Sequence, residues 1–273
     1  MDFDEEARKL FKKLETEKEK EIPNEISNND LSKYGSNMKL LSQHEEGIGI
    51  IPVKTSPLSS RYNALDEIYK DHITKQSLYV GNQSAASSIE ILAENNIRYI
   101  VNCTHGPSKI PNFFERKTIN NKRVHYFEFP ISHWSMLIQN SSHESILSFV
   151  LGLFEFIELA WSKKSNVLIH CLAGAHRAGT TGCLCLMHYA KLQPMKAKEL
   201  AKQCRPVIDP IGMLPELLNR YDMARNESHQ YRDYFPIRID ERKLKKQQAQ
   251  QQSHENNNKY STASLTTTAT EVA

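Results

Sequence analysis

The sequence predicts an α/β fold with a central, mostly parallel sheet flanked by helices, and two observations carry this prediction. Between residues 77 and 227, short β-rich runs alternate with stretches whose apolar residues follow helical spacing. Strands that alternate with helices along a chain are typical of a sheet with helices on both faces. The two ends of the chain lack this alternation, which predicts one folded domain between two extensions.

The first half of this domain supplies three strands and a helix. The runs SLYV (77–80) and IRYIVN (97–102) are short and rich in β-branched and aromatic residues, which predicts two strands. VHYFEFPIS (124–132) predicts a third strand. The segment between the first two strands predicts a helix, since it has helical spacing at Ile89, Leu92, Ala93 and Asn96.

The second half is mainly helical around one apolar strand. NVLIH (166–170) predicts that strand, and a helix is expected from just after Cys171 to about residue 192. A helix that opens with Pro194 in its first turn comes next. Apolar side chains at helical spacing predict the helix before the strand (Ile146, Phe149, Val150, Leu153, Ile157, Ala160), the helix after Pro194 (Ala197, Leu200, Ala201, Cys204) and a last helix (Leu214, Leu217, Leu218, Tyr221).

The two extensions differ in composition from the domain. Residues 1–76 are mostly polar, with a charged helical pattern early and then Asn, Ser and Pro without a period, which predicts a partly flexible extension. Residues 228–273 are of low complexity and have too few apolar side chains to offset the chain entropy of folding. We therefore expect a disordered tail.

Charge and composition argue against several classes of partner. The net charge is only +3, so charge gives no reason to expect a nucleic-acid partner. No apolar stretch approaches the ~20 residues of a membrane span, and residues 1–21 lack the apolar core of a secretory signal.

The five cysteines are an odd number without a CxxC pair, which predicts neither a metal site nor a disulfide scaffold. We expect a cytoplasmic or nuclear protein.

The segment NVLIHCLAGAHRAGTTG (166–182) carries the candidate chemistry. A strand that runs into a tight loop and then a helix forms an anion site, because the loop amides converge and the helix start is positive. Cys171 at the start of this loop is expected to be a thiolate nucleophile, and Arg177 offers a planar fork to two phosphoryl oxygens. Gly174 and Gly179 allow tight curvature. The product of such a site is a cysteinyl phosphate. A core cysteine followed by an exposed arginine would leave the glycines unexplained.

The segment HCLAGAHRAG resembles the signature of the dual-specificity protein phosphatases, with His-Cys, a glycine three residues after the cysteine, and then the arginine. SLYVGNQSAAS, IRYIVNCT and CRPVIDPIGMLPELL resemble the family's opening strand, next strand, and closing loop and helix. The resemblance covers about residues 77–225. It implies a phosphatase-like domain and metal-independent dephosphorylation without a cofactor. It places the phosphate-binding loop at Leu172, Ala173, Gly174, Ala175, His176 and Arg177, with His170 and Gly179 as supporting residues.

The sequence departs from the family pattern at two catalytic positions. Directly after the arginine, where the family has Ser or Thr, stands Ala178, although Thr180 and Thr181 lie close in sequence. The missing hydroxyl implies slower breakdown of the phosphoenzyme. The family's general acid is an aspartate, but residues 110–207 contain no Asp, and His133 stands where we would look for it. General acids contribute roughly 10²–10⁴ in rate.

His133 is therefore the candidate acid, and it would shift the pH optimum toward acidic values. The alternative is a surface-loop histidine beside Trp134. Glu128 is expected within a strand, and Glu144 and His143 at the start of the long helix are weaker candidates. All three fit the role less well than His133.

Two more residues near the predicted loop have open roles. His176 either attracts anionic substrates as a cation or faces solvent. The loop has no lysine, unlike phosphoinositide-selective relatives, which favours phosphorylated protein side chains as substrates.

Cys103 ends a strand predicted to run parallel to the one before Cys171. Its thiol either resolves an oxidised Cys171 as a disulfide or is an inert buried thiol.

Two functions of different classes follow. The first is a slow protein phosphatase with Cys171 as its nucleophile and Arg177 stabilising the transition state. The second is a module that binds phosphorylated partners with negligible turnover, which the missing aspartate and Ala178 favour. Retention of both Cys171 and Arg177 favours the phosphatase. RNA 5′-phosphates stay an open alternative without support from the charge, and the sequence leaves the oligomeric state open.

Overall fold

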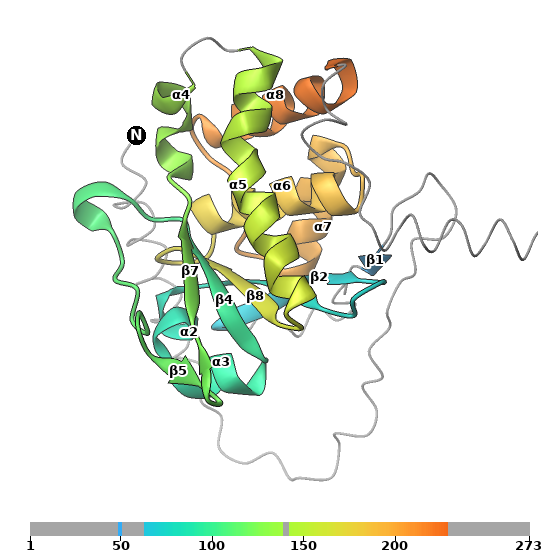
Figure 1. The fold of residues 1–273 in the computed structure, drawn as a ribbon. Helices are drawn as coiled ribbons and strands as arrows, with labels where there is room; N and C mark the ends of the chain where they lie inside the picture. Colours follow the sequence, from blue (N-terminus) through green and yellow to red (C-terminus); the bar gives the residue numbers. More distant parts are fainter. Residues whose placement is uncertain (1–48, 51–62, 139–141, 229–273) are drawn as a thin grey trace, which may run out of the picture. The chain divides into compact units, whose positions relative to one another are not determined.

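The computed structural model describes residues 49–50, 63–138 and 142–228, and its fold is drawn in Figure 1. Most of the predicted N-terminal extension and nearly all of the predicted tail lie outside these residues. The main sheet has six strands in the order β1-β2-β3-β8-β4-β7. Their bounds are β1 Gly49–Ile50, β2 Leu65–Asp71, β3 Ser77–Gly81, β4 Ile97–Asn102, β7 His125–Glu128 and β8 Asn166–His170. A small hairpin is formed by β5 (Thr118–Ile119) and β6 (Lys122–Arg123).

The four strands β3, β8, β4 and β7 are parallel, whereas β1 and β2 are antiparallel neighbours at one edge. The predicted α/β class with a mostly parallel sheet is therefore confirmed. The sheet begins earlier than predicted, because β2 lies inside the segment expected to be a polar extension. Asp66 and Asp71 give β2 a polar composition, yet both side chains are buried against polar partners.

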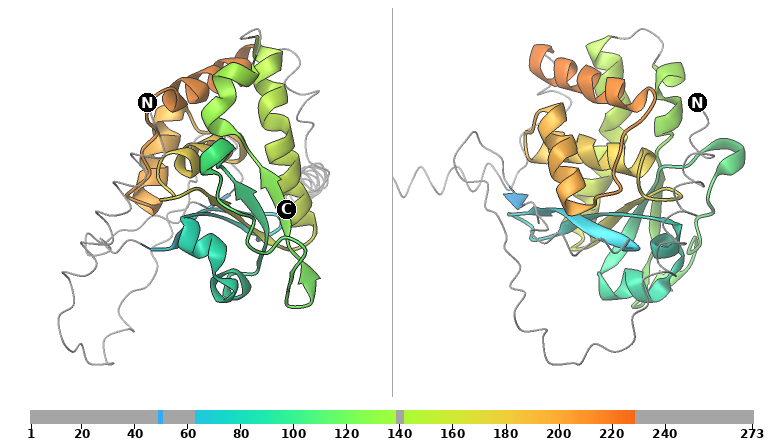
Figure 2. Two further views of the ribbon diagram at one scale, coloured as in Figure 1. Left: turned by 90° about the vertical axis from the view of Figure 1, so that its left-hand side faces the viewer. Right: turned by 180° about the vertical axis from the view of Figure 1, so that it is seen from behind.

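Helices cover both faces of the sheet, as Figures 1 and 2 show. On one face lie α2 (Gln83–Ser87) and α3 (Ile89–Glu94), packed on β3, β8 and β4. On the other lie α5 (His143–Ser162), α6 (Arg177–Tyr189), α7 (Pro194–Cys204) and α8 (Leu214–Glu227). Three of these helices have side-chain N-caps: Asn82 for α2, Ser88 for α3 and Ser142 for α5 each accept a bond from the backbone N–H three residues on.

Helix α5 corrects one expectation, because its 20 residues have the length and composition of a membrane span. Its apolar residues nevertheless follow helical spacing, and one face is buried against β4, β8 and α8. Ile146, Val150 and Leu153 on that face are at most 1% exposed. The composition of α5 is thus explained by its place in the core.

Helix α6 is buried on every side, which is unusual for a helix of a single domain. It contacts β8, β3 and β2 of the sheet as well as α7 and α8. This explains why Cys183 and Cys185, which point in different directions, are both fully buried, as expected for small core residues.

The parallel strands bring three chain segments to one edge of the sheet. Asn102 at the end of β4 is in register with Glu128 on one side and with His170 on the other. The segments after these strands, beginning at Cys103, Phe129 and Cys171, therefore leave the sheet at the same level. The carboxyl ends of parallel strands are where α/β folds place their ligands.

Candidate active site

The predicted loop lies between β8 and α6. Cys171 is only 1% exposed, and Arg177, the first residue of α6, is 2% exposed. Gly174 has a φ of +67°, and a Cβ there would lie 2.5 Å from the carbonyl oxygen of Gly81. Glycine is therefore required at this position both by backbone conformation and by space.

Four successive carbonyl groups of the loop accept hydrogen bonds from outside it. Gln83 N–H donates to the oxygen of Leu172 at 3.0 Å, and Asp209 N–H donates to that of Ala175 at 3.2 Å. The two carbonyls between them are both bound by Arg205, with Nη2 3.1 Å from the oxygen of Ala173 and Nε 3.0 Å from that of Gly174. All four oxygens therefore point outward, away from the loop's concave side.

This outward pattern determines where the amides point. In a planar trans peptide the C=O of one residue and the N–H of the next point in opposite directions. No peptide bond among the described residues is cis. The N–H groups of residues 173 to 176 therefore point into the loop. The loop leads directly into the N-terminus of α6. Converging amides at a helix N-terminus beside a guanidinium are suited to a phosphoryl group.

Arg205 is a site residue that sequence reasoning missed. Its side chain is 1% exposed, and Nη1 lies 2.7 Å from Oδ2 of Asp66 and 2.9 Å from the carbonyl oxygen of Asn63. It thus joins the segment that opens the described domain to the loop carbonyls. The sequence signal was one arginine in CRPVID, and its partners are 31 to 142 residues away.

His170 and Gly179 lie where they were expected, and the structure explains each differently. His170 is fully buried, and burial lowers its pKa to about 4, with the Arg177 charge acting in the same direction and the Cys171 backbone opposing it. Its imidazole is therefore neutral between pH 5 and 8. Gly179 lies inside α6 rather than at a bend, and a Cβ there would lie 2.9 Å from the Ile208 side chain. It permits close packing rather than curvature.

The hydroxyls near Ala178 are engaged elsewhere. Thr180 Oγ1 donates to the His176 carbonyl at 2.7 Å, and Thr181 Oγ1 donates to the Arg177 carbonyl at 3.0 Å. Ala178 itself is fully buried. Neither threonine hydroxyl therefore replaces the one that the family carries after the arginine.

His133 ends a short 3-10 helix, η3 (Ile131–His133), which follows β7 at the carboxyl edge of the sheet and lies beside α6. Its half-buried ring is in edge contact with that of His105, 5.3 Å between centroids, and its Nδ1 lies 3.3 Å from Ser132 Oγ. His105 follows β4 at the same edge. Two imidazoles therefore lie together at the edge of the sheet from which the loop also leaves.

Three carboxylates are less suitable proton donors: Glu128 and Glu144, considered above as alternatives, and Asp209 between α7 and α8. Glu128 is paired with Lys109, a hydrogen bond that lowers its pKa. Glu144 lies in the first turn of α5. Partial burial acts to raise the pKa of Asp209, but Lys202 and Lys198, both 3.4 Å from its Oδ1, outweigh it and lower the pKa. Glu128 and Asp209 are therefore ionised at neutral pH.

The expectation that His176 could face solvent is wrong. Its side chain is 8% exposed, and Nδ1 lies 2.6 Å from the carbonyl oxygen of Asp209. A carbonyl only accepts, so Nδ1 carries a proton and donates it. Together with the bond from Asp209 N–H to Ala175, this contact fastens the loop to the segment between α7 and α8.

Cys103 lies beside the loop, because its N–H donates to the His170 carbonyl at 2.9 Å. Its thiol is fully buried and 3.3 Å from Thr181 Oγ1. Burial raises its pKa, and the nearby Cys171 adds to this. A raised pKa slows attack by this thiol on an oxidised neighbour, since the thiolate is the nucleophile.

We expect mild peroxide to oxidise Cys171 and then, slowly because of the raised Cys103 pKa, to produce a Cys103–Cys171 disulfide, found by peptide mapping without reduction. In Cys103→Ser the linked peptide should be absent and over-oxidised Cys171 should accumulate. Cys183→Ser is the matched control, since it removes another buried thiol. If the wild type yields no linked peptide, Cys103 is an inert core residue.

Comparison with known proteins gives the class of this site. The family "Dual specificity phosphatase, catalytic domain" matches residues 78–223, just over half of the chain. The chain therefore belongs to the dual specificity phosphatases and contains their catalytic domain. This confirms the resemblance drawn from the loop motif.

The same region of the chain is similar to individual proteins. The chain is 37% identical over 135 residues to human dual specificity protein phosphatase 9, which covers 49% of this chain and 31% of that protein. It is 29% identical over 157 residues to mouse dual specificity protein phosphatase 19, covering 57% and 64%. The match thus spans about a third of the first of these relatives. The crystal structure of human DUSP28 is 21% identical, with a TM-score of 0.42, and the match covers 55% of this chain and 90% of that one.

Proposed function

We propose that the protein is a cysteine-dependent phosphatase that removes phosphate from phosphorylated protein side chains through a cysteinyl-phosphate intermediate. The observation that carries this proposal is the loop, whose four carbonyls are held outward so that its amides converge beside Cys171 and Arg177. Phosphoprotein substrates are supported by residues 172–176, which contain no lysine. A cytoplasmic or nuclear location, without nucleic-acid or membrane partners, belongs to the same proposal.

The reaction takes place in two steps. The Cys171 thiolate attacks phosphorus, so that an S–P bond forms and the bond from phosphorus to the side-chain oxygen breaks. Arg177 and the loop amides stabilise the charge on the transferring oxygens. His133 as imidazolium gives its proton to the departing oxygen. In the second step the neutral His133 takes a proton from water, the water oxygen attacks phosphorus, and the thiolate leaves with inorganic phosphate as the product.

Slow turnover is part of this proposal. The second step must expel a thiolate without the hydroxyl that the family places after the arginine, since Ala178 has none and both nearby threonines bond to helix carbonyls. The same observation favours a second candidate function, a catalytically weak module that binds phosphorylated partners. In that case the loop would hold a phosphoryl group without expelling it.

The test is hydrolysis of an aryl phosphate from pH 5 to 8 by the wild type, Cys171→Ser and His133→Ala. We expect cysteine-dependent turnover that rises toward acidic pH, because His133 acts in its protonated form. Removing His133 should lower the acidic-side rate by roughly 10²–10⁴ and flatten the profile. His143→Ala, another half-buried histidine, should keep the wild-type profile.

Two outcomes would change this conclusion. An unaltered pH profile in His133→Ala would remove His133 from the mechanism and leave the phosphatase in place. A folded wild type with no turnover above the Cys171→Ser blank, but with retained binding of a phosphotyrosyl peptide, would establish the phosphate-binding module instead.

A further inference from the structure

One face of α8, together with its N-cap residue, carries four side chains in a symmetric order. Met213, Glu216, Arg220 and Met223 follow each other at intervals of three, four and three residues, so they lie along one stripe of the helix. The order is apolar, acidic, basic, apolar. Met213 and Met223 are 54% and 50% exposed, and the side chains of Glu216 and Arg220 are 45% and 33% exposed. We call these four residues the α8 stripe.

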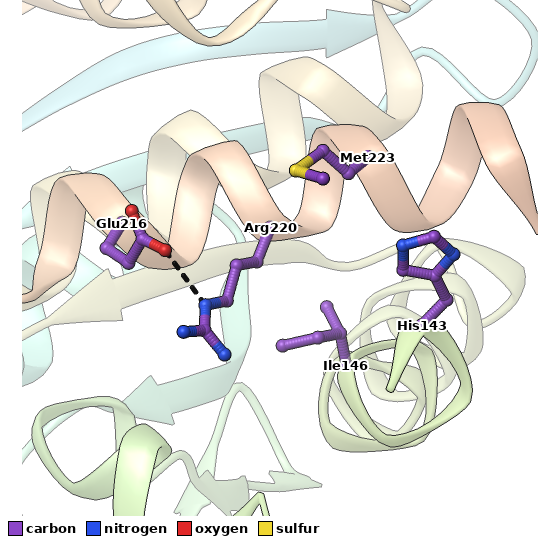
Figure 3. Close-up of a pocket in the computed structure, with 5 residues that line it drawn as sticks. All are labelled: His143, Ile146, Glu216, Arg220 and Met223. Carbon is purple, nitrogen blue, oxygen red and sulfur yellow. Dashed lines mark hydrogen bonds and ion pairs between the residues drawn. The ribbon is translucent and has the colours of Figure 1, made fainter. Parts of the chain in front are cut away.

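The stripe borders a pocket of about 260 Å³ between α8 and the first turns of α5. Figure 3 shows Ile146 and His143 on α5 below α8, which carries Glu216, Arg220 and Met223, with Glu216 bonded to Arg220. The pocket therefore has an apolar wall, Ile146 and Met223, beside a charged pair. Such a pocket is suited to an unbranched apolar side chain.

Exposed apolar side chains gather around this stripe. Helix α4 (Trp134–Leu137) is joined to the start of α8 by a 3.2 Å hydrogen bond from Trp134 Nε1 to the Met213 carbonyl. Of the seven large apolar side chains exposed in the described part of the chain, four lie on α4 or in the stripe: Met136, Leu137, Met213 and Met223. A concentration of this kind marks a contact surface.

The charged pair at the centre of the stripe is held in a fixed orientation. Arg220 Nε lies 2.9 Å from Glu216 Oε1, and the guanidinium lies over the Trp134 ring, 5.4 Å from its centroid. Trp134 is itself buried. The pair is thus pre-organised for a partner, since little side-chain entropy is lost when the contact forms.

We propose that the α8 stripe binds the same stripe of a second copy of this chain, antiparallel, with a two-fold axis near residue 218. Positions 213 and 223, and positions 216 and 220, are each symmetric about 218. Each Met213 then faces Met223 of the second copy and enters the pocket beside it, while each Glu216 faces Arg220 of the second copy.

The charge order is the argument for a second copy over an unrelated partner. An acidic–basic pair on a helix is complementary to the same pair on a second copy only when the two helices run antiparallel. A two-fold axis produces this arrangement. A parallel arrangement would place Arg220 against Arg220 and Glu216 against Glu216. In the antiparallel arrangement each Glu216 lies against an Arg220 of the other copy, so that two such contacts form. Four methionines surround these contacts, and their flexible side chains adapt in shape to each other.

The experiment is sedimentation velocity of the full chain from low-micromolar to several-hundred-micromolar concentration. The wild type should pass from monomer to dimer. In Glu216→Arg the facing side chains are all basic, and in Arg220→Glu they are all acidic, so each variant should self-associate at least ~10-fold more weakly. An equimolar mixture of the two variants places Arg against Glu in both contacts, and it should form a 1:1 dimer.

The mixture separates the proposal from a loss of folding, because each variant carries the same like-charged pair within its own helix whether alone or mixed. Thermal melts should stay cooperative for both. Glu94→Arg, on the exposed side of α3, is the matched charge reversal and should dimerise as the wild type does. A wild type that stays monomeric, single variants that dimerise normally, or a mixture that stays monomeric would each overturn the proposal.

Discussion

Replacing Arg177 with lysine is expected to lower aryl phosphate turnover by about 10³-fold or more. Arg177 is the first residue of α6, is 2% exposed, and directly follows the loop whose amides point inward. Its planar fork binds two phosphoryl oxygens at once as they gain charge, whereas a lysine keeps the charge but offers a single ammonium. The loss should fall on kcat as well as on kcat/KM, because the contact strengthens in the transition state.

The measurement is steady-state kinetics at a pH where the wild type is most active. Arg220→Lys is the matched control, since it makes the same replacement on α8 outside the loop and should keep the wild-type rate. A rate for Arg177→Lys within tenfold of the wild type would show that charge alone suffices at this position.

Removing the Arg205 side chain as Arg205→Ala is expected to lower the free energy of unfolding by about 3–5 kcal/mol. The Asp66 carboxylate, 5% exposed, would stay buried without its cation. The carbonyls of Ala173 and Gly174 would also lose their donor. The bonds from Arg205 keep these carbonyls pointing outward, and the N–H groups of the next residues therefore point into the loop. Turnover should therefore fall even under conditions where the variant is folded.

Urea unfolding followed by circular dichroism measures the stability, and aryl phosphate hydrolysis measures the loop. Arg205→Lys is the informative second variant. Its ammonium can still neutralise Asp66 but cannot bond to Asp66, Asn63 and both loop carbonyls, so much of the stability should return while the activity stays low. A change below about 1 kcal/mol in Arg205→Ala would contradict the role given to this side chain.

The fold class and the loop could be predicted because their signals are local. The parallel strands are short β-rich runs, and α5, α7 and α8 have apolar residues at helical spacing. The motif at residues 170 to 179 contains a nucleophile, a glycine with positive φ and a guanidinium within one short loop. These features depend on neighbours in sequence, and the structure has them where they were expected.

The features that sequence reasoning missed depend on distant partners. Strand β2 looked polar because it contains Asp66 and Asp71, and the cation that neutralises the buried Asp66, Arg205, lies 139 residues away in the chain. Arg205 was not singled out in the sequence, and solvent exposure was one of two expectations for His176, yet both are buried by contacts with residues more than 30 positions away. A buried charge is identified only through its partner, and the partner is known only once the chain has folded.

The outward bonds of the loop also set the order in which the site forms during synthesis. Domains fold as the chain leaves the ribosome from its N-terminus. Cys171 and its loop emerge before Arg205, which holds two of the loop carbonyls, and before Asp209, which holds a third and also fixes His176. Cys171 is therefore synthesised before the residues that hold the loop around it. Nascent chains that end before residue 205 contain the complete signature motif without the bonds that hold three of the four loop carbonyls.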